Sequence, residues 1–191
     1  MSSNEKVWFQ ATRSSRVWFY ADRVGHGDHD HGNRVGARRR QFQNKKTLIL
    51  GSGGATPSII IGLKRLGVEN ITISNRTKDK AIKLKEKFNF LEILEWGQTI
   101  NAEIVLNTTS LGLKESDNIK LDYSMFGSDS FFYDLIYNPK ETNFLKNAKK
   151  HGCLIQNGLM MFVYQASEAF KTWHNIQPNI DKNLISFLEN D

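Results

Sequence analysis

Cysteine, proline and long hydrophobic runs are scarce in this chain of 191 residues, which has one cysteine, Cys153, and three prolines. A lone cysteine cannot form a disulfide within the chain and is too few for a cysteine-rich metal site, as is usual in a reducing compartment. No hydrophobic run approaches the roughly 20 residues that span a bilayer, and the first residues lack the pattern of a signal peptide. We therefore expect a cytoplasmic protein that is neither membrane-spanning nor secreted.

The formal net charge of +6 is distributed unevenly along the chain. Residues 1–44 contain seven Arg and one Lys against four acidic residues, whereas residues 45–191 contain two Arg and sixteen Lys against sixteen acidic residues. The longer segment is nearly neutral. Folded nucleic-acid-binding proteins usually gather positive charge on one face, together with stacking aromatic residues. We therefore do not expect nucleic acid as a partner of the main domain.

Residues 1–44 differ in kind from the rest of the chain. Val7-Trp8-Phe9 recurs as Val17-Trp18-Phe19, and residues 26–31 combine three histidines with two aspartates. Imidazoles and carboxylates bind zinc or nickel, but structural sites hold such ligands on a defined turn. We expect an irregular or disordered arm without a metal site, followed by a folded domain over residues 45–191. Two alternatives stay open: the arm binds a metal or nucleic acid, or it is foreign to the domain, as a frameshift or a mispredicted start would make it.

A strand, a glycine-rich turn and a helix are expected at the start of the folded domain. Thr47 to Leu50 form a short hydrophobic run, the sequence Gly51-Ser52-Gly53-Gly54-Ala55 follows, and Pro57 begins a helical stretch that ends near Gly67. Proline is tolerated in a first helical turn, and glycine is frequent just after a helix ends. Such a turn lets backbone N–H groups approach a pyrophosphate at the helix N-terminus. A tight structural connection is the alternative, because Thr56 stands where the dinucleotide fingerprint usually has a third small residue.

The end of the next expected strand, residues 70–74, indicates the choice of nucleotide. NAD-binding proteins usually carry Asp or Glu at this place, where it bonds the ribose 2′-hydroxyl. This chain has Asn75-Arg76-Thr77 instead, with Lys80 one helical turn after Arg76. The two cations would neutralise a 2′-phosphate, so the residues favour NADP over NAD. The alternative is that Arg76 and Lys80 are ordinary solvated charges at a helix start.

The remaining pattern alternates strands and helices. We expect strands at residues 102–106, 131–137 and 153–155, and helices at residues 78–88, 141–150 and 158–173. This alternation predicts an α/β fold with a doubly wound, mainly parallel Rossmann-type sheet and helices on both faces. On the last long helix, Phe162, Ala166, Ala169, Phe170 and Trp173 are expected to form the core-facing stripe, with Gly158, Met161 and Gln165 on another face.

Five motifs, in order and with suitable spacing, resemble the NADP-binding half of the shikimate dehydrogenase family over residues 45 to about 175. They are Gly51 to Ala55, Asn75 to Thr77, Asn107 to Gly112, Tyr133 to Pro139 and Asn157 to Ala166. The resemblance implies an NADP-dependent oxidoreductase of chorismate and aromatic amino-acid biosynthesis, which interconverts 3-dehydroshikimate and shikimate.

The resemblance also implies a role for individual residues. The pyrophosphate would lie against Gly51, Ser52, Gly53, Gly54 and Ala55, and the adenosine 2′-phosphate against Asn75, Arg76, Thr77 and Lys80. The nicotinamide ribose and ring would be lined by Asn107, Thr108, Thr109, Ser110, Leu111, Leu135, Gly158 and Met161. Tyr137 and Gln165 match residues that hydrogen-bond the substrate.

The catalytic half of the family has no recognisable counterpart in the chain. The family uses a Lys and Asp pair from an N-terminal substrate domain, but Lys6 is the only lysine before Lys45 and no Asn-Thr-Asp triplet occurs. We therefore expect a truncated shikimate dehydrogenase that retains the cofactor half and has little activity alone. A non-catalytic NADP-binding module is the alternative.

Overall fold

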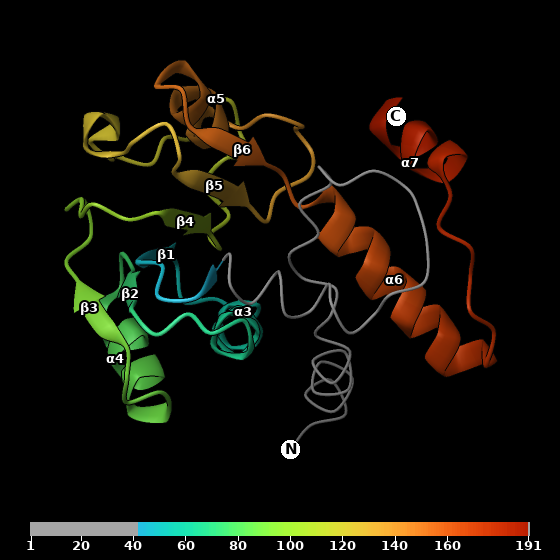
Figure 1. Ribbon diagram of the computed structural model, residues 1–191, viewed down its shortest axis with the longest axis horizontal. Coiled ribbons are helices and arrows are strands. Elements are labelled where there is room, and N and C mark those ends of the chain that lie inside the picture. The colour runs from blue at the N-terminus through green and yellow to red at the C-terminus, as the bar shows by residue number, and fades with distance from the viewer. Residues whose placement is uncertain (1–41, 191) are drawn as a thin grey trace.

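A six-stranded parallel β-sheet organises residues 42–190, which are the residues that the computed structural model describes. The strand order is β3-β2-β1-β4-β5-β6, and every neighbouring pair is parallel. The strands are β1 (Thr47–Leu50), β2 (Ile71–Ser74), β3 (Glu92–Leu94), β4 (Ile104–Asn107), β5 (Phe131–Asp134) and β6 (Leu154–Gln156). This topology confirms the predicted Rossmann-type fold (Figure 1).

Helices cover both faces of the sheet. Helices α3 (Thr56–Arg65) and α4 (Lys78–Lys87) lie on one face and α5 (Asn143–Lys150) on the other. The remaining elements are a 3₁₀ turn, η2 (Tyr123–Met125), and the C-terminal helices α6 (Leu159–His174) and α7 (Lys182–Asn190). Side chains alternate along a strand, so Ile49 packs in one core with α3 and α4, while Leu48 and Leu50 pack in a second core with α5. Figure 1 shows α3 and α5 on opposite sides of the strands.

The local signals for α3 act as predicted. Pro57 lies in its first turn, Lys64 and Arg65 lie in its last turn, and Gly67 follows with a φ of +88°. The two cations complement the negative C-terminal end of the helix dipole, and glycine adopts the left-handed conformation without steric cost. The segment before β1 is also packed, because Phe42 is buried in the core beneath α3 and α4. The rest of the predicted arm, including residues 26–31, lies outside the described residues.

The observed sheet differs from the prediction in two details, one strand that ends earlier and one that was missed. The strand expected over residues 131–137 ends at Asp134, because the Asp134 carboxylate accepts a hydrogen bond from the Ile136 N–H at 3.0 Å and turns the chain out of the sheet. The short strand β3 was not predicted. It lies at the edge of the sheet and its residues are only partly buried or exposed, so it lacks the hydrophobic run that marks a central strand.

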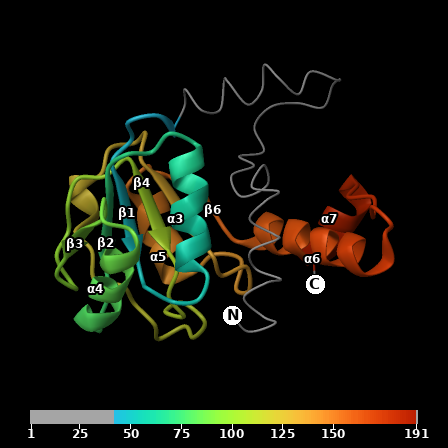
Figure 2. The same cartoon turned by 90° about the horizontal axis from the view of Figure 1, so that it is seen from below.

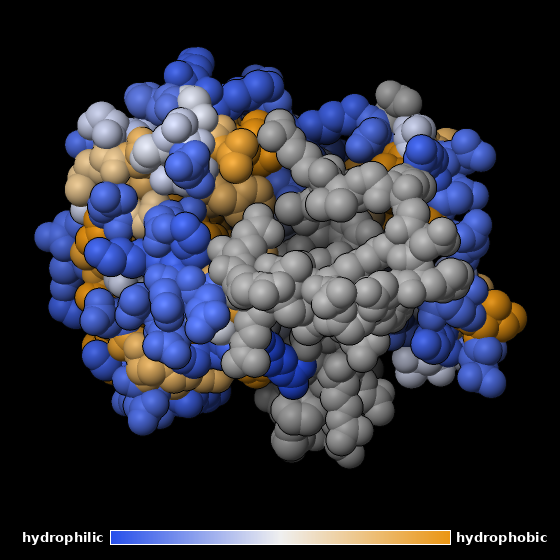
Figure 3. All heavy atoms as spheres, in the orientation of Figure 1, coloured by the Kyte–Doolittle hydropathy of each residue, from blue (hydrophilic) through white to orange (hydrophobic). Residues whose placement is uncertain are grey.

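The predicted core-facing stripe of the last helix is wrong. The buried residues of α6 are Leu159, Val163 and Ser167, whereas Phe170 and Trp173 are 42% and 71% exposed. Figure 2 shows the reason: α6 leaves the sheet at its N-terminal end and projects away with α7, so the sheet and the other helices of residues 42–190 do not cover its second half. Hydrophobic atoms reach the surface in this part of the molecule (Figure 3). No helix among residues 42–190 is long and apolar enough to cross a membrane.

Candidate functional site

The carboxyl ends of β1, β4 and β5 meet at one edge of the sheet. Strand order reverses between β1 and β4, because the chain runs from β1 to β2 and β3 on one side and resumes with β4 on the other. Such a switch point leaves a crevice beyond the strand ends, where open α/β sheets bind their ligands. The predicted site residues of the five motifs lie at or after the carboxyl ends of β1, β2, β4 and β5, at the start of α4 or in the first half of α6.

The glycine turn after β1 packs directly on the loop after β4. Gly51 has a φ of +108°, and a Cβ atom there would lie 2.7 Å from the Thr108 hydroxyl oxygen, so no other residue fits. Thr108 donates its N–H to the Leu50 carbonyl oxygen at 2.8 Å. The Thr56 and Thr108 hydroxyl oxygens lie 2.9 Å apart. Thr56 is thus fully buried against Thr108, which explains how this chain accommodates threonine at the third position of the fingerprint.

The same turn presents polar groups that have no hydrogen-bond partner among residues 42–190. The Ser52 hydroxyl is buried and forms no hydrogen bond with a described residue. The N–H groups of Gly53, Gly54 and Ala55 donate to no backbone acceptor within residues 42–190, and Ala55 provides no side-chain cap for α3. A Cβ atom on Gly54 would have no neighbour within 4 Å, so the turn has open space beside it. A helix N-terminus with free N–H groups and an unpaired hydroxyl fits an anionic group such as a pyrophosphate.

The residues after β2 place positively charged side chains near the carboxyl ends of the strands. Asn75 is fixed by its side-chain N–H, which donates to the Thr77 carbonyl oxygen at 2.7 Å. Lys78 is already paired with Glu95. Arg76 and Lys80 are exposed and form no ion pair with a described residue, so both cations are available to a phosphate.

A buried polar network joins the ends of β4 and β5. Asn107 and Asp134 are both fully buried, and the Asn107 side-chain N–H donates to Asp134 at 3.0 Å. The Thr142 hydroxyl donates to the other carboxylate oxygen at 2.6 Å. Burial raises the pKa of Asp134, and these hydrogen bonds oppose that rise. Sequence reasoning did not single out Asp134 or Thr142, although an acidic residue inside a hydrophobic strand was the available signal.

Asn107 also shapes the loop that follows β4. Its side-chain oxygen accepts hydrogen bonds from the Thr109 N–H at 3.0 Å and from the Thr109 hydroxyl at 2.7 Å, and its side-chain N–H donates to the Leu111 carbonyl oxygen. Ser110 is exposed at the tip, and Leu111 packs on the core beneath α5.

The start of α6 fits tightly against the segment after β5. A Cβ atom on Gly158 would lie 2.0 Å from the Leu135 carbonyl oxygen, and the Gly158 N–H donates to the Ile136 carbonyl oxygen at 3.2 Å. Met161 is partly buried against the core beneath α3, and Gln165 is half-buried one turn further along α6. Tyr137 stacks on Phe162, with ring centroids 4.7 Å apart, and is 41% exposed. The structure therefore brings Leu135 and Gly158 together and places Tyr137 and Gln165 along the same stretch of α6.

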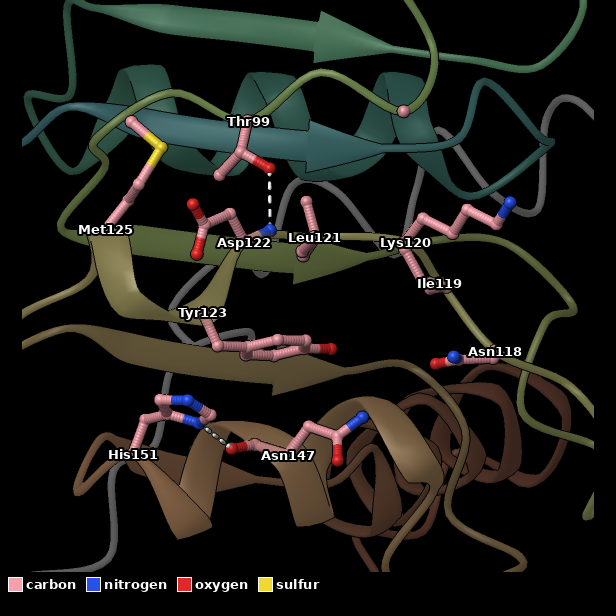
Figure 4. Close-up of a pocket in the computed structure, with 11 residues that line it drawn as sticks. Thr99, Asn118, Ile119, Lys120, Leu121, Asp122, Tyr123, Met125, Asn147 and His151 are labelled. Carbon is pink, nitrogen blue, oxygen red and sulfur yellow. Dashed lines mark hydrogen bonds between the residues drawn. The ribbon is translucent and has the colours of Figure 1, made fainter.

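A separate cavity of about 690 Å³ lies on the face that carries α5 (Figure 4). It is lined by residues of the segment before β4, of the β4–β5 connection and of α5, and none of the predicted site residues is among them. Its Tyr123 ring stacks on His151 and on Phe132, and burial raises the pKa of Tyr123 to about 12. No group of three His, Cys, Asp or Glu side chains suited to a metal ion occurs within the described part of the chain.

Comparison with known proteins identifies relatives of this fold and sequence. A family model described as shikimate / quinate 5-dehydrogenase matches residues 34–113. A shikimate dehydrogenase (NADP(+)) of Pelagibacter ubique is 54% identical over 150 residues, which are 78% of this chain and 57% of that protein. Its counterpart from Caldicellulosiruptor bescii is 44% identical over 157 residues, which are 78% of this chain and 54% of that protein.

Solved structures agree with the sequence relatives. The crystal structure of a shikimate dehydrogenase from Aquifex aeolicus aligns with a TM-score of 0.66 and 34% identity, over 78% of this chain and 55% of that one. A 5-ketofructose reductase of Gluconobacter aligns with a TM-score of 0.69 and 26% identity, over 82% of this chain and 61% of that one. The chain thus spans little more than half the length of the curated relatives that it matches.

Proposed function

Since the chain belongs to the shikimate dehydrogenase family, we propose that residues 45–191 are the cofactor-binding half of an NADP-dependent shikimate dehydrogenase. The observation that supports this proposal most directly is the glycine turn at the switch point, with its unpartnered Ser52 hydroxyl. The positively charged side chains after β2, where Asn75 stands in place of a carboxylate, support NADP rather than NAD.

Each group of residues at the carboxyl ends of the strands binds a different part of the dinucleotide. The turn from Gly51 to Ala55 holds the pyrophosphate through its N–H groups, and Arg76 and Lys80, beside Asn75 and Thr77, hold the 2′-phosphate. The nicotinamide ribose and ring lie against the loop from Asn107 to Leu111 and against Leu135, Gly158 and Met161. When bound, NADPH would supply the hydride that reduces the substrate ketone, and NADP⁺ would accept the hydride in the reverse direction.

Among the described residues, the family resemblance assigns only Tyr137 and Gln165 to the substrate. Tyr137 and Gln165 provide one edge that hydrogen-bonds 3-dehydroshikimate or shikimate. Reduction of the ring ketone also needs an acid to protonate the developing alkoxide, and such a group is worth about 10² to 10⁴ in rate. The family resemblance assigns this role to a Lys and Asp pair of a substrate domain. We therefore propose that the chain turns over shikimate only when such a domain is supplied.

The nucleotide choice is tested by titrating the purified 191-residue chain with NADP⁺ and NAD⁺ and measuring binding heats. The wild-type chain is expected to bind NADP⁺ more tightly. Arg76→Ala is expected to cost about 1.5 to 3 kcal/mol of NADP⁺ binding and to leave NAD⁺ binding nearly unchanged, because it removes a hydrogen bond to a charged phosphate. An equal loss for both dinucleotides would contradict the assignment of Arg76.

A non-catalytic NADP-binding module is the second candidate, because the chain spans little more than half of its relatives. The two candidates differ in a complementation assay. Joining the substrate domain of a two-domain relative ahead of Lys45 should restore shikimate oxidation by at least about 10²-fold if the chain is a truncated enzyme. If the joined protein binds NADP⁺ and shikimate but stays inactive, the module is the better description. A metal- or nucleic-acid-binding role of residues 1–44 is tested by deleting them and measuring both kinds of binding.

A further inference from the structure

Asp134 is a buried acidic residue that forms no ion pair with any described residue. Its carboxylate accepts three hydrogen bonds, from the Asn107 side chain at 3.0 Å, the Ile136 N–H at 3.0 Å and the Thr142 hydroxyl at 2.6 Å. All three partners are donors, and Thr142 keeps its own proton for Asp134 because its oxygen accepts the Leu145 N–H. Three donors suit an ionised carboxylate, so the network holds a negative charge inside the domain.

Through these bonds Asp134 joins three segments, and a fourth lies next to its chain neighbour Leu135. Asn107 ends β4 and in turn fixes Thr109 and Leu111 in the following loop. Ile136 belongs to the segment that leaves β5, and Thr142 is the N-cap of α5. The residue next to Asp134 is Leu135, whose carbonyl oxygen lies against Gly158 at the start of α6. Loss of the Asp134 carboxylate would leave the donors of Asn107, Ile136 and Thr142 without this acceptor.

The position of this network determines which half of a dinucleotide it serves. Arg76 and Lys80, which form no ion pair with a described residue, follow β2 on one side of the switch point, and the glycine turn follows β1 at its centre. A dinucleotide bound across the crevice with its 2′-phosphate at β2 has its other half over the ends of β4 and β5. Asp134 ends β5 and Asn107 ends β4, side by side in register.

We propose that Asp134 is a positioning residue for the nicotinamide half of the dinucleotide and that its buried charge favours the oxidised cofactor. This inference rests on the proposed NADP site. The oxidised nicotinamide ring carries a positive charge and the reduced ring is neutral. The negative charge of the Asp134 carboxylate therefore attracts the oxidised ring and not the reduced one. In a protein interior this attraction is screened less than in water.

The test uses the full 191-residue chain and three ligands: NADP⁺, NADPH and adenosine 2′,5′-bisphosphate, which carries the 2′-phosphate and lacks the nicotinamide. Asp134→Asn keeps the size of the side chain and removes the charge. We expect this variant to bind NADP⁺ at least about tenfold more weakly, since it loses the equivalent of one charge-assisted hydrogen bond. Its preference for NADP⁺ over NADPH should fall by about threefold or more, and its affinity for the bisphosphate should stay within about twofold of wild type.

Two further variants separate the proposed role from a loss of stability. Ser130→Ala removes a buried hydrogen bond, to the Ala102 carbonyl oxygen, at the opposite end of β5, so it should change none of the three affinities. Thr142→Val removes one donor and keeps the charge of Asp134. It should weaken NADP⁺ and NADPH alike and preserve the ratio between them, and Thr142→Ser should restore both.

The possible results distinguish the role of Asp134 from the NADP site on which that role depends. If the wild-type chain binds neither NADP⁺ nor the bisphosphate, the proposed function is wrong and the inference falls with it. If the wild type binds both and Asp134→Asn changes the three affinities equally or not at all, the NADP site stands and the role of Asp134 is refuted. Should Asp134→Asn fail to fold, an unchanged NADP⁺ affinity in Thr142→Val would refute the positioning role by itself.

Discussion

Gly158→Ala tests how closely the start of α6 packs against the segment after β5. The added Cβ atom would lie 2.0 Å from the Leu135 carbonyl oxygen and 2.6 Å from its carbonyl carbon. These are backbone atoms, so no side-chain rotation relieves the overlap, and either α6 or the segment after β5 must move. The φ of Gly158 is −81°, which any residue adopts, so the penalty is steric and not conformational.

The expected cost follows from this geometry. Inserting a methyl group into a well-packed site typically costs about 1 to 3 kcal/mol, and the upper end applies because backbone has to shift. For a domain of this size a loss of about 3 kcal/mol lowers Tm by roughly 6 to 12 °C. The same displacement moves Leu135 and the start of α6, so NADP⁺ affinity should fall while binding of adenosine 2′,5′-bisphosphate is kept.

The assay is urea unfolding of the full chain, followed by titration with the two ligands. Gly127→Ala is the matched control, because its Cβ atom would meet nothing within 4 Å and its φ is not positive. That variant should be unchanged or up to about 1 kcal/mol more stable, since alanine restricts the unfolded chain. If Gly158→Ala is as stable as Gly127→Ala, the close approach of α6 to β5 is wrong.

Two further predictions concern single polar groups. Ser52→Ala should leave the free energy of unfolding unchanged or slightly higher, because the buried hydroxyl has no partner among the described residues. The variant should bind NADP⁺ more weakly by roughly 1 kcal/mol. A clear loss of stability in urea unfolding would contradict this prediction. Glu103 has a pKa held below its usual 4.5 by hydrogen bonding to Lys45, so its contribution to stability is present above that value and is lost as pH falls through the lowered pKa. Glu103→Gln should therefore lose less stability than wild type between about pH 5 and pH 3 in urea titrations at each pH, and identical pH profiles would refute the assignment.

The sequence by itself determined the elements whose signals are local. The glycine turn after Thr47–Leu50, the proline and glycine at the two ends of α3, and the alternation of strands with helices all predicted the Rossmann-type sheet that the structure contains. The preference for NADP was likewise predicted from residues close together in the chain. Asn75 stands where NAD-binding proteins usually have a carboxylate, and Arg76 and Lys80 lie one helical turn apart. These features are encoded by residue types within a few positions of one another.

Only the tertiary structure decided the features that depend on partners distant in sequence. The hydrophobic period of α6 indicated an apolar side, but the sheet covers only the start of the helix, so Leu159 and Val163 are buried while Trp173 is exposed. The hydrogen bonding of the buried Asp134 carboxylate likewise depends on donors on Asn107, 27 positions earlier, and on Thr142, 8 positions later. Burial and hydrogen bonding are properties of the assembled layers, and a residue's own type does not specify which other segment will lie against it.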